Sequence, residues 1–269
     1  MINIDLYKGD CLEVLDSLIA NGVKVDLILC DPPYGTMSCS WDQVIPFNDM
    51  WDRLKKIRKN DNTPTLLFNT EPFGSALRMS NIKEFKFDWI WDKKSAGNVL
   101  VAKYQPLKNT ENISVFSKKK CNYYPIFEFG HKDRTKEKPV TKKSDLFSGI
   151  KSGLLYHTDK NKPADARYPK NIIEVSKQSS ECCNSKAVHP TQKPIDLLKY
   201  LLITHSKEND VVLDFTMGSG SCAVACLELG NRNFIGIEKS DKYFDISKSR
   251  VSTYLNNNIN NDIDVTVHE

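Results

Sequence analysis

Two short apolar segments of this chain each end in a polar turn, and this pairing limits the fold more than any other feature. Residues 25–30 lead into the motif Asp-Pro-Pro-Tyr at 31–34, and residues 211–213 lead into a glycine-containing motif at 214–220. Parallel α/β sheets bind ligands in the crevice beyond the carboxyl ends of their strands, where such turns lie. We therefore expect the two motifs to border one site.

Alternating strand and helix patterns along the chain favour the same fold class. Short β-branched and apolar runs predict strands at 2–7, 25–30, 65–69, 89–91, 113–116, 211–214 and 234–238. Amphipathic periodicity predicts helices at 11–20, 47–57, 72–80, 194–205, 221–229 and 241–255. The prediction is an α/β fold with a mostly parallel sheet and helices on both faces.

Positive charge is concentrated in one internal stretch. The whole chain has a net charge of +4, but residues 118–170 hold fourteen Lys/Arg against six Asp/Glu, which is +8 and leaves −4 for the rest. This stretch also contains seven Tyr and Phe residues. Basic and aromatic side chains together suit phosphate contacts and base readout, although a solvated loop has the same composition. The candidate DNA-binding residues are Lys118, Lys119, Lys120, Lys142 and Lys143.

These patterns suggest a domain organisation with an insertion. We predict one half of a catalytic domain at 1–117, a basic target-recognition insert at 118–187, the cofactor-binding half at 188–255, and a C-terminal tail at 256–269 whose Asn-rich stretch 256–261 is frayed. The N-terminus does not resemble a signal peptide and no apolar run reaches membrane-spanning length. The eight cysteines are scattered without paired C-x-x-C motifs, so we predict reduced thiols, no metal and a cytoplasmic protein.

The second motif suits an adenosine-containing cofactor. Gly218 and Gly220 lack a Cβ atom, so the backbone can turn sharply and approach a ligand closely. Glu238 ends the next predicted strand, where a carboxylate can accept hydrogen bonds from ribose hydroxyls. Asp10 follows the first strand and can either accept from an adenine amino group or cap the helix that begins at Cys11. NAD, FAD and S-adenosylmethionine all fit this pattern, as does a purely structural glycine turn.

The first motif suits chemistry at an amino group of a nucleobase. The Asp31 carboxylate and the Pro32 carbonyl can accept both N–H bonds of an exocyclic amine, which localises its lone pair, while Tyr34 stacks on the base. Pro33 stiffens the turn. An ordinary turn that closes a buried strand is the structural alternative. Methylation at cytosine carbon 5 is disfavoured, because it needs a thiolate after a proline and none of the twelve prolines precedes a cysteine.

At these residues the chain resembles the DNA amino-methyltransferases, in particular their circularly permuted β class. In that class the Asp-Pro-Pro-Tyr motif comes first, then a target-recognition insert, and then a His-Pro-Thr-Gln-Lys-Pro element before the cofactor glycines. Here that element stands complete at 189–194. The resemblance extends from Asp10 to Glu238. It implies a Rossmann-like sheet of seven strands, S-adenosylmethionine as the methyl donor, a flipped target base and DNA as the partner.

The resemblance also implies roles for individual residues. Asp31, Pro32, Pro33 and Tyr34 form the expected catalytic motif, and Lys193 is placed near the cofactor carboxylate. With the residues argued above, the expected cofactor site consists of Asp10, Cys11, Asp31, His189, Thr191, Gln192, Lys193, Phe215, Thr216, Gly218, Ser219, Gly220, Ser221, Glu238 and Lys239. A homodimer and a cognate restriction endonuclease are further partners that the family suggests.

One residue departs from the family pattern. The family usually has Asp-Pro-Phe before the glycines, whereas this chain has Asp214, Phe215 and Thr216. Either Phe215, one position earlier, replaces the missing aromatic side chain beside the cofactor, or the affinity for the cofactor is reduced. We expect methylation of adenine N6 in DNA. The alternatives are methylation of cytosine N4 and a relative that binds DNA without catalysis.

Overall fold

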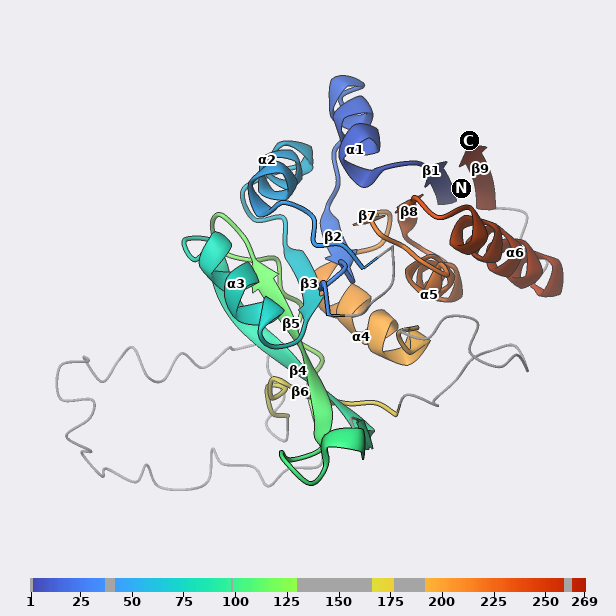
Figure 1. Ribbon diagram of the computed structural model, residues 1–269. Helices are drawn as coiled ribbons and strands as arrows, with labels where there is room; N and C mark the ends of the chain where they lie inside the picture. Colours follow the sequence, from blue (N-terminus) through green and yellow to red (C-terminus); the bar gives the residue numbers. More distant parts are fainter. Residues whose placement is uncertain (1, 37–41, 98, 130–165, 177–191, 259–262) are drawn as a thin grey trace. The chain divides into compact units, whose positions relative to one another are not determined.

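The computed structural model describes residues 2–36, 42–97, 99–129, 166–176, 192–258 and 263–269. In this part of the chain nine strands form one sheet in the order β6-β4-β5-β3-β2-β7-β8-β1-β9 (Figure 1). The strands are β1 (Ile2–Lys8), β2 (Leu27–Cys30), β3 (Thr65–Asn69), β4 (Phe85–Gly97), β5 (Lys108–Phe116), β6 (Ile172–Glu174), β7 (Val211–Asp214), β8 (Asn233–Glu238) and β9 (Ile263–His268).

Most neighbouring strands run parallel. The pairs β1–β8, β1–β9, β2–β3, β2–β7, β7–β8 and β4–β6 are parallel, and β5 alone pairs antiparallel with both β3 and β4. The prediction of a mostly parallel α/β sheet is therefore confirmed. The described sheet has two strands more than the seven that the family resemblance implied, and these are its outermost strands, β6 and β9.

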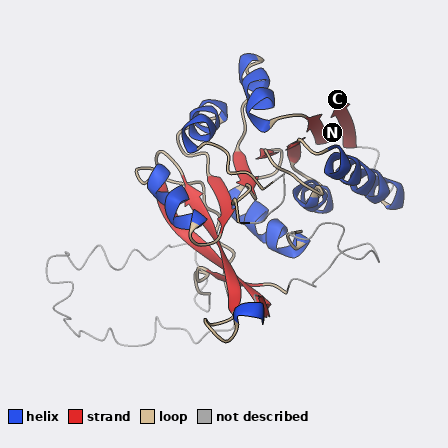
Figure 2. Ribbon diagram, in the orientation of Figure 1, coloured by secondary structure: helices blue, strands red, loops and turns tan. Residues whose placement is uncertain are grey.

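Among the described residues, six α-helices cover the two faces of this sheet (Figure 2). They are α1 (Cys11–Ala20), α2 (Phe47–Ile57), α3 (Phe73–Ser80), α4 (Ile195–His205), α5 (Ser221–Leu229) and α6 (Asp241–Asn257). One core cluster joins α1, α2 and α3 to the sheet, and a second joins α4, α5 and α6. Successive side chains of a strand point to opposite faces of the sheet, so a strand covered on both faces contributes to both clusters. In β2, Leu27 and Leu29 belong to one cluster, and Ile28 and Cys30 belong to the other.

The central pair β2–β7 positions the two sequence motifs side by side. The register pairs Leu27 with Val212 and Ile28 with Leu213 in parallel, so both strands end at the same edge of the sheet. The helix after β2 lies on one face and the helix after β7 lies on the other. The two connections therefore diverge and leave a crevice beyond the strand ends, the usual ligand position in open α/β sheets.

Three features differ from the sequence prediction. Residues 263–268 are strand β9, parallel to β1, rather than part of a tail, and Asn256 and Asn257 still belong to α6. Strands β4 and β5 are much longer than expected, and a 3-10 helix, η1 (Val99–Val101), lies between them. Strand β6 lies within the predicted insert.

The chain divides into two compact units. Residues 1–124 and 171–269 form the first, and residues 125–170 form the second. Within the described part of the second unit, Glu128 and Arg167 form a β-bridge, and the rings of Phe127 and Tyr168 are 5.1 Å apart. The predicted insert boundaries, 118–187, thus enclose the second unit. None of the described helices has the length and apolar character needed to cross a membrane.

Candidate active site

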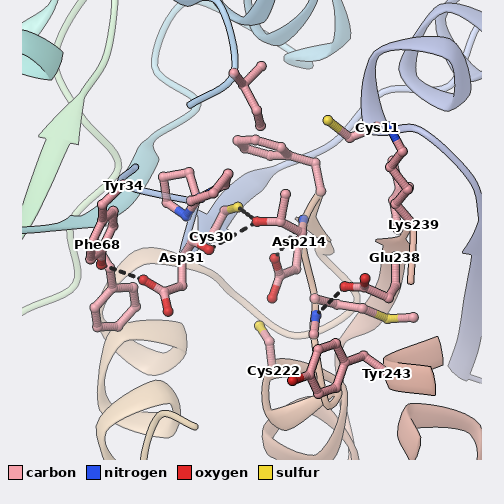
Figure 3. A pocket seen from close by; sticks show the side chains of 18 of the residues that line it. Cys11, Cys30, Asp31, Tyr34, Phe68, Asp214, Cys222, Glu238, Lys239 and Tyr243 are labelled. Carbon is pink, nitrogen blue, oxygen red and sulfur yellow. Dashed lines mark hydrogen bonds between the residues drawn. The ribbon is translucent and has the colours of Figure 1, made fainter. Parts of the chain in front are cut away.

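A pocket with a volume of about 660 Å³ lies beyond the ends of β2, β7 and β8. Both sequence motifs line it, together with residues 9–12 after β1 and Gln192 and Lys193 before α4. In Figure 3, Asp31 and Glu238 lie on opposite sides of the pocket with Asp214 between them. The predicted convergence of the two motifs is present in the structure.

The loop after β2 is held in shape by a buried carboxylate that sequence reasoning missed. Asp42, only 6% exposed, accepts main-chain hydrogen bonds from Tyr34 at 2.8 Å, Gly35 at 3.0 Å and Thr36 at 2.7 Å. The Tyr34 ring packs against Phe73 with its centroid 5.1 Å away. Because prolines 32 and 33 have no N–H, these bonds come from the residues that follow them.

The Asp31 carboxylate has a partner on each oxygen. The Tyr34 hydroxyl donates to Oδ1 at 2.5 Å, and Lys193 Nζ donates to Oδ2 at 2.5 Å. Lys193 is 8% exposed, and its Nζ also lies 3.6 Å from a Glu111 oxygen and over the ring of Phe68. Burial alone lowers the pKa of Lys193, but the Asp31 and Glu111 carboxylates outweigh it and raise this pKa. The lysine therefore stays cationic beside Asp31.

The loop after β7 is built around Glu238. Its carboxylate accepts from the Gly218 amide at 2.9 Å and from the Ser240 amide at 2.7 Å, which ties the glycine loop to the end of β8. Burial raises the pKa of Glu238, and these amide donors oppose that rise. Gly220 has a φ of +76°, and an added Cβ would lie 2.9 Å from the Ser247 Cβ. Only glycine fits there without displacing α6.

Asp10 has the capping role that the sequence left open. Its side chain accepts from the Leu12 amide at 2.9 Å at the start of α1 and lies 3.1 Å from Lys239 Nζ. The residue also lines the pocket, and its second oxygen, Oδ2, is the one that contacts Lys239. Although burial raises the pKa of Asp10, the Lys239 and amide contacts lower it overall.

Asp214 is a buried acid in the middle of the site. Burial raises its pKa to about 7, and the nearby Asp31 and Glu238 carboxylates act in the same direction. The Thr216 amide, which donates to Oδ1 at 3.3 Å, and the Cys30 thiol oppose that rise. The sequence analysis quoted this residue in its motif but gave it no role.

The structure brings most of the predicted site residues to this pocket. Lining residues among them are Asp10, Cys11, Asp31, Pro32, Pro33, Tyr34, Gln192, Lys193, Phe215, Thr216, Gly218, Ser219, Ser221, Glu238 and Lys239. Gly220 instead packs against α6. His189, Thr191, Lys142 and Lys143 lie outside the described residues. Lys118 and Lys119 each lie 3.1 Å from Asp61, away from the pocket, and Lys120 is exposed.

Several lining residues escaped sequence reasoning. Phe68, Trp91 and Glu111 come from strands β3, β4 and β5, and Tyr243 comes from the first turn of α6. None belongs to a motif, and Glu111 lies in the part of β5 that was not predicted as strand. The weak signal for Tyr243 was its place shortly after Glu238, at the start of the next helix.

The residues present fit an adenosine cofactor with a charged methionine end. The cavity is within the range of small-molecule sites. Glu238 and Asp10 offer carboxylate acceptors at one side, apolar walls are formed by Ile237, Met217 and Tyr243, and the cation of Lys193 lies at the other side. A glycine loop with an acid at the end of the next strand defines a nucleotide-cofactor-binding α/β protein.

Comparison with known proteins narrows this class to one family. The family model described as DNA methylase, N6_N4_Mtase, matches residues 25–249. The Type II methyltransferase M1.MboII of Moraxella bovis is 30% identical over 263 residues, which is 88% of this chain and 92% of that protein. The chain therefore belongs to the N6/N4 DNA methylase family of S-adenosylmethionine-dependent DNA amino-methyltransferases, and its cofactor is S-adenosylmethionine.

Solved structures share the fold. The crystal structure of the M1.HpyAVI–SAM complex matches with a TM-score of 0.62 and 25% identity, over 92% of this chain and 98% of that chain. PvuII DNA methyltransferase, whose title calls it cytosine-N4-specific, matches with a TM-score of 0.58 and 15% identity, over 99% of this chain and 95% of that chain. The latter likeness concerns the fold alone.

Proposed function

We propose that this DNA methyltransferase methylates the exocyclic N6 of adenine, held as a flipped base against the loop 31–34. The observation that carries the proposal is the convergence of the two motif loops on one pocket, where Thr216 Oγ1 donates to the Asp31 main-chain oxygen at 3.0 Å. The loop expected to hold the amine and the loop expected to hold the cofactor are thus in direct contact. S-adenosylmethionine supplies a methyl group activated by positive sulfur.

The acceptor loop is suited to an amino group. A carboxylate has about four lone-pair sites, so Asp31 can accept from Tyr34 and Lys193 and still accept an amine N–H. The Pro32 carbonyl is the expected second acceptor. Two accepted N–H bonds direct the nitrogen lone pair away from the base ring, toward the methyl group, and Tyr34 provides an aromatic face for stacking.

The cofactor roles proposed for the chain follow the same geometry. Glu238 is placed for the ribose hydroxyls, Asp10 for the adenine amino group and Lys193 for the carboxylate. In this proposal His189 and Thr191 join the site from outside the described residues. We further propose that the basic insert 118–187 contacts DNA. Relatives such as M1.MboII are named Type II methyltransferases, so we assign this chain to the modification side of a restriction system.

Nucleoside analysis tests the target base. The purified protein is incubated with S-adenosylmethionine and unmethylated DNA, and the DNA is digested to nucleosides for mass detection. We expect N6-methyldeoxyadenosine, and we expect D31N to lower the rate by about 100-fold or more, the scale of a lost acid–base group. The matched control is D52N, because Asp52 is exposed on α2, where it pairs with Lys56 at 3.7 Å, and does not line the pocket. It should methylate like the unaltered protein.

Two outcomes would contradict the proposal. N4-methylcytosine as the sole product would refute the adenine assignment and favour the nearest alternative. Absence of any product, with DNA binding retained and no heat of S-adenosylmethionine binding in calorimetry, would instead identify a DNA-binding relative without catalysis. Modification-sensitive sequencing of the same DNA would report the recognition site.

A further inference from the structure

Thr216 lies at the junction of the two loops, where the family pattern has an aromatic residue. Its hydroxyl donates to the Asp31 main-chain oxygen at 3.0 Å and lies 2.9 Å from Cys30 Sγ. A hydroxyl has a single proton, so after donating to Asp31 it can meet the Cys30 thiol only as an acceptor. Burial raises the pKa of Cys30, which keeps that thiol protonated.

These contacts fix the position of one loop relative to the other. The Asp31 carbonyl belongs to the peptide bond with Pro32, so a hydrogen bond at this oxygen restrains the start of the acceptor loop. Asp42 restrains the other end through the amides of residues 34–36. The Thr216 amide in turn contacts Asp214 at 3.3 Å, within the cofactor loop. The phenylalanine of the family pattern has no hydroxyl and cannot make this bridge.

We propose that Thr216 is a positioning residue that sets the separation between the methyl donor and the amino acceptor. The inference rests on the proposed function, because it takes the loop 31–34 as the site of the base. A displacement of one loop by about 1 Å lowers the rate of a positioned reaction by roughly 100-fold, while each ligand can still bind its own loop. The expected signature is a slower methyl-transfer step with little change in cofactor affinity.

The test compares T216V, which keeps the shape but removes the hydroxyl, with T216S, which keeps the hydroxyl. Single-turnover transfer of labelled methyl groups to DNA gives the rate of the chemical step, and calorimetry gives the Kd for S-adenosylmethionine. For T216V we expect a rate loss of about 10- to 100-fold and a Kd within about 3-fold of the unaltered protein, the size of a neutral hydrogen bond or less. T216S should restore most of the rate.

Two further variants keep the test interpretable. T253V makes the same chemical change at an exposed position of α6 and should change neither quantity. C30A removes the thiol but leaves the Thr216–Asp31 bond, so it should lose less rate than T216V and serves as the probe if T216V does not fold. A C30A rate loss as large as that expected for T216V would then count against the proposal.

The results separate this proposal from the proposed function. A T216V rate equal to that of the unaltered protein, or equal losses in rate and cofactor affinity, would overturn the positioning role while adenine methylation stands. Cytosine N4 as the product would refute the adenine assignment and leave the Thr216 comparison valid, because the rate counts methyl groups on either base. An unaltered protein that transfers no methyl group would contradict both.

Discussion

Asp214 shows how far burial can change a single residue. Its carboxyl is 6% exposed, at the end of β7 between Asp31 and Glu238. A carboxylate in that position loses hydration and faces two like charges, so its pKa is raised from 3.8 to about 7. At neutral pH the pocket therefore holds a fraction of protonated Asp214, which can donate a hydrogen bond as well as accept one.

This raised pKa makes folding stability depend on pH. A carboxyl whose pKa is higher in the folded than in the unfolded protein stabilises the folded state while it is protonated. For Asp214 this contribution is complete below pH 3.8 and is lost as the pH rises through 7. Between pH 5 and pH 8 we expect the free energy of unfolding of the unaltered protein to fall by about 2.5 kcal/mol relative to that of D214N, whose side chain at position 214 does not titrate. Urea unfolding of both proteins at the two pH values measures this difference. A difference independent of pH would show that Asp214 has an ordinary pKa.

At the scale of elements, α6 supports the cofactor loop from behind. One guanidinium nitrogen of Arg250, Nη1, contacts the Ser219 carbonyl at 2.7 Å, the Ser219 hydroxyl at 3.0 Å and the Ser221 hydroxyl at 3.1 Å. One turn earlier, Ser247 packs directly against Gly220. The helix that follows β8 thus shapes the loop that follows β7, although the two are separated by a whole strand and helix in the sequence.

Removing this support should weaken cofactor binding. Because hydrogen bonds to a charged group contribute about 1.5–3 kcal/mol, we expect R250A to raise the Kd for S-adenosylmethionine by about 10- to 100-fold, with partial recovery in R250K. Calorimetry measures the affinity. K248A is the matched control, since Lys248 lies on the same helix and pairs with Glu269 at 2.6 Å outside the pocket. Unchanged affinity in R250A would mean that the loop holds its shape without α6.

At the scale of the whole molecule, charge is divided unevenly along the chain. The stretch 118–170 carries +8 and the remainder −4. At its start, Lys118 and Lys119 share one carboxylate, Asp61, and Lys120 is exposed. Exposed ion pairs contribute little to the stability of the folded protein, so these lysines can exchange them for contacts with phosphate. Three lysines and one acid leave a local charge of +2 that is available to a polyanion.

Substitution of Lys118, Lys119 and Lys120 by Gln should reduce the salt dependence of DNA binding. Each neutralised phosphate contributes about 0.9 to the slope of log K against log salt concentration, so a loss of roughly two is expected. Fluorescence anisotropy with labelled duplex DNA at several salt concentrations provides the slope. Gln substitutions of Lys55, Lys56 and Lys83 remove the same charge elsewhere on the surface and should leave the slope nearly unchanged. Equal slopes for both triple variants would refute a specific role for residues 118–120.

Local patterns were sufficient for most of the elements. Helices α1, α2 and α5 and strands β3 and β7 match their predicted bounds, because each is delimited by a turn-forming residue or a change of periodicity. Strand β9 was missed because the alternating segment 263–268 is short and follows an Asn-rich stretch. Its pairing with β1, more than two hundred residues away, is what makes it a strand. Likewise, β4 and β5 pair with each other over a longer stretch than the sequence of either segment indicates by itself.

The sequence by itself determined the fold class, the two motif loops and the acid at Glu238, since these follow from short-range patterns and from where strands end. Only the tertiary structure decided the network around them. Lys193 and Thr216 both donate hydrogen bonds to Asp31, and Glu111 and Tyr243 line the pocket. Such contacts join residues far apart in the chain, and their geometry depends on how strands and helices pack rather than on any local preference.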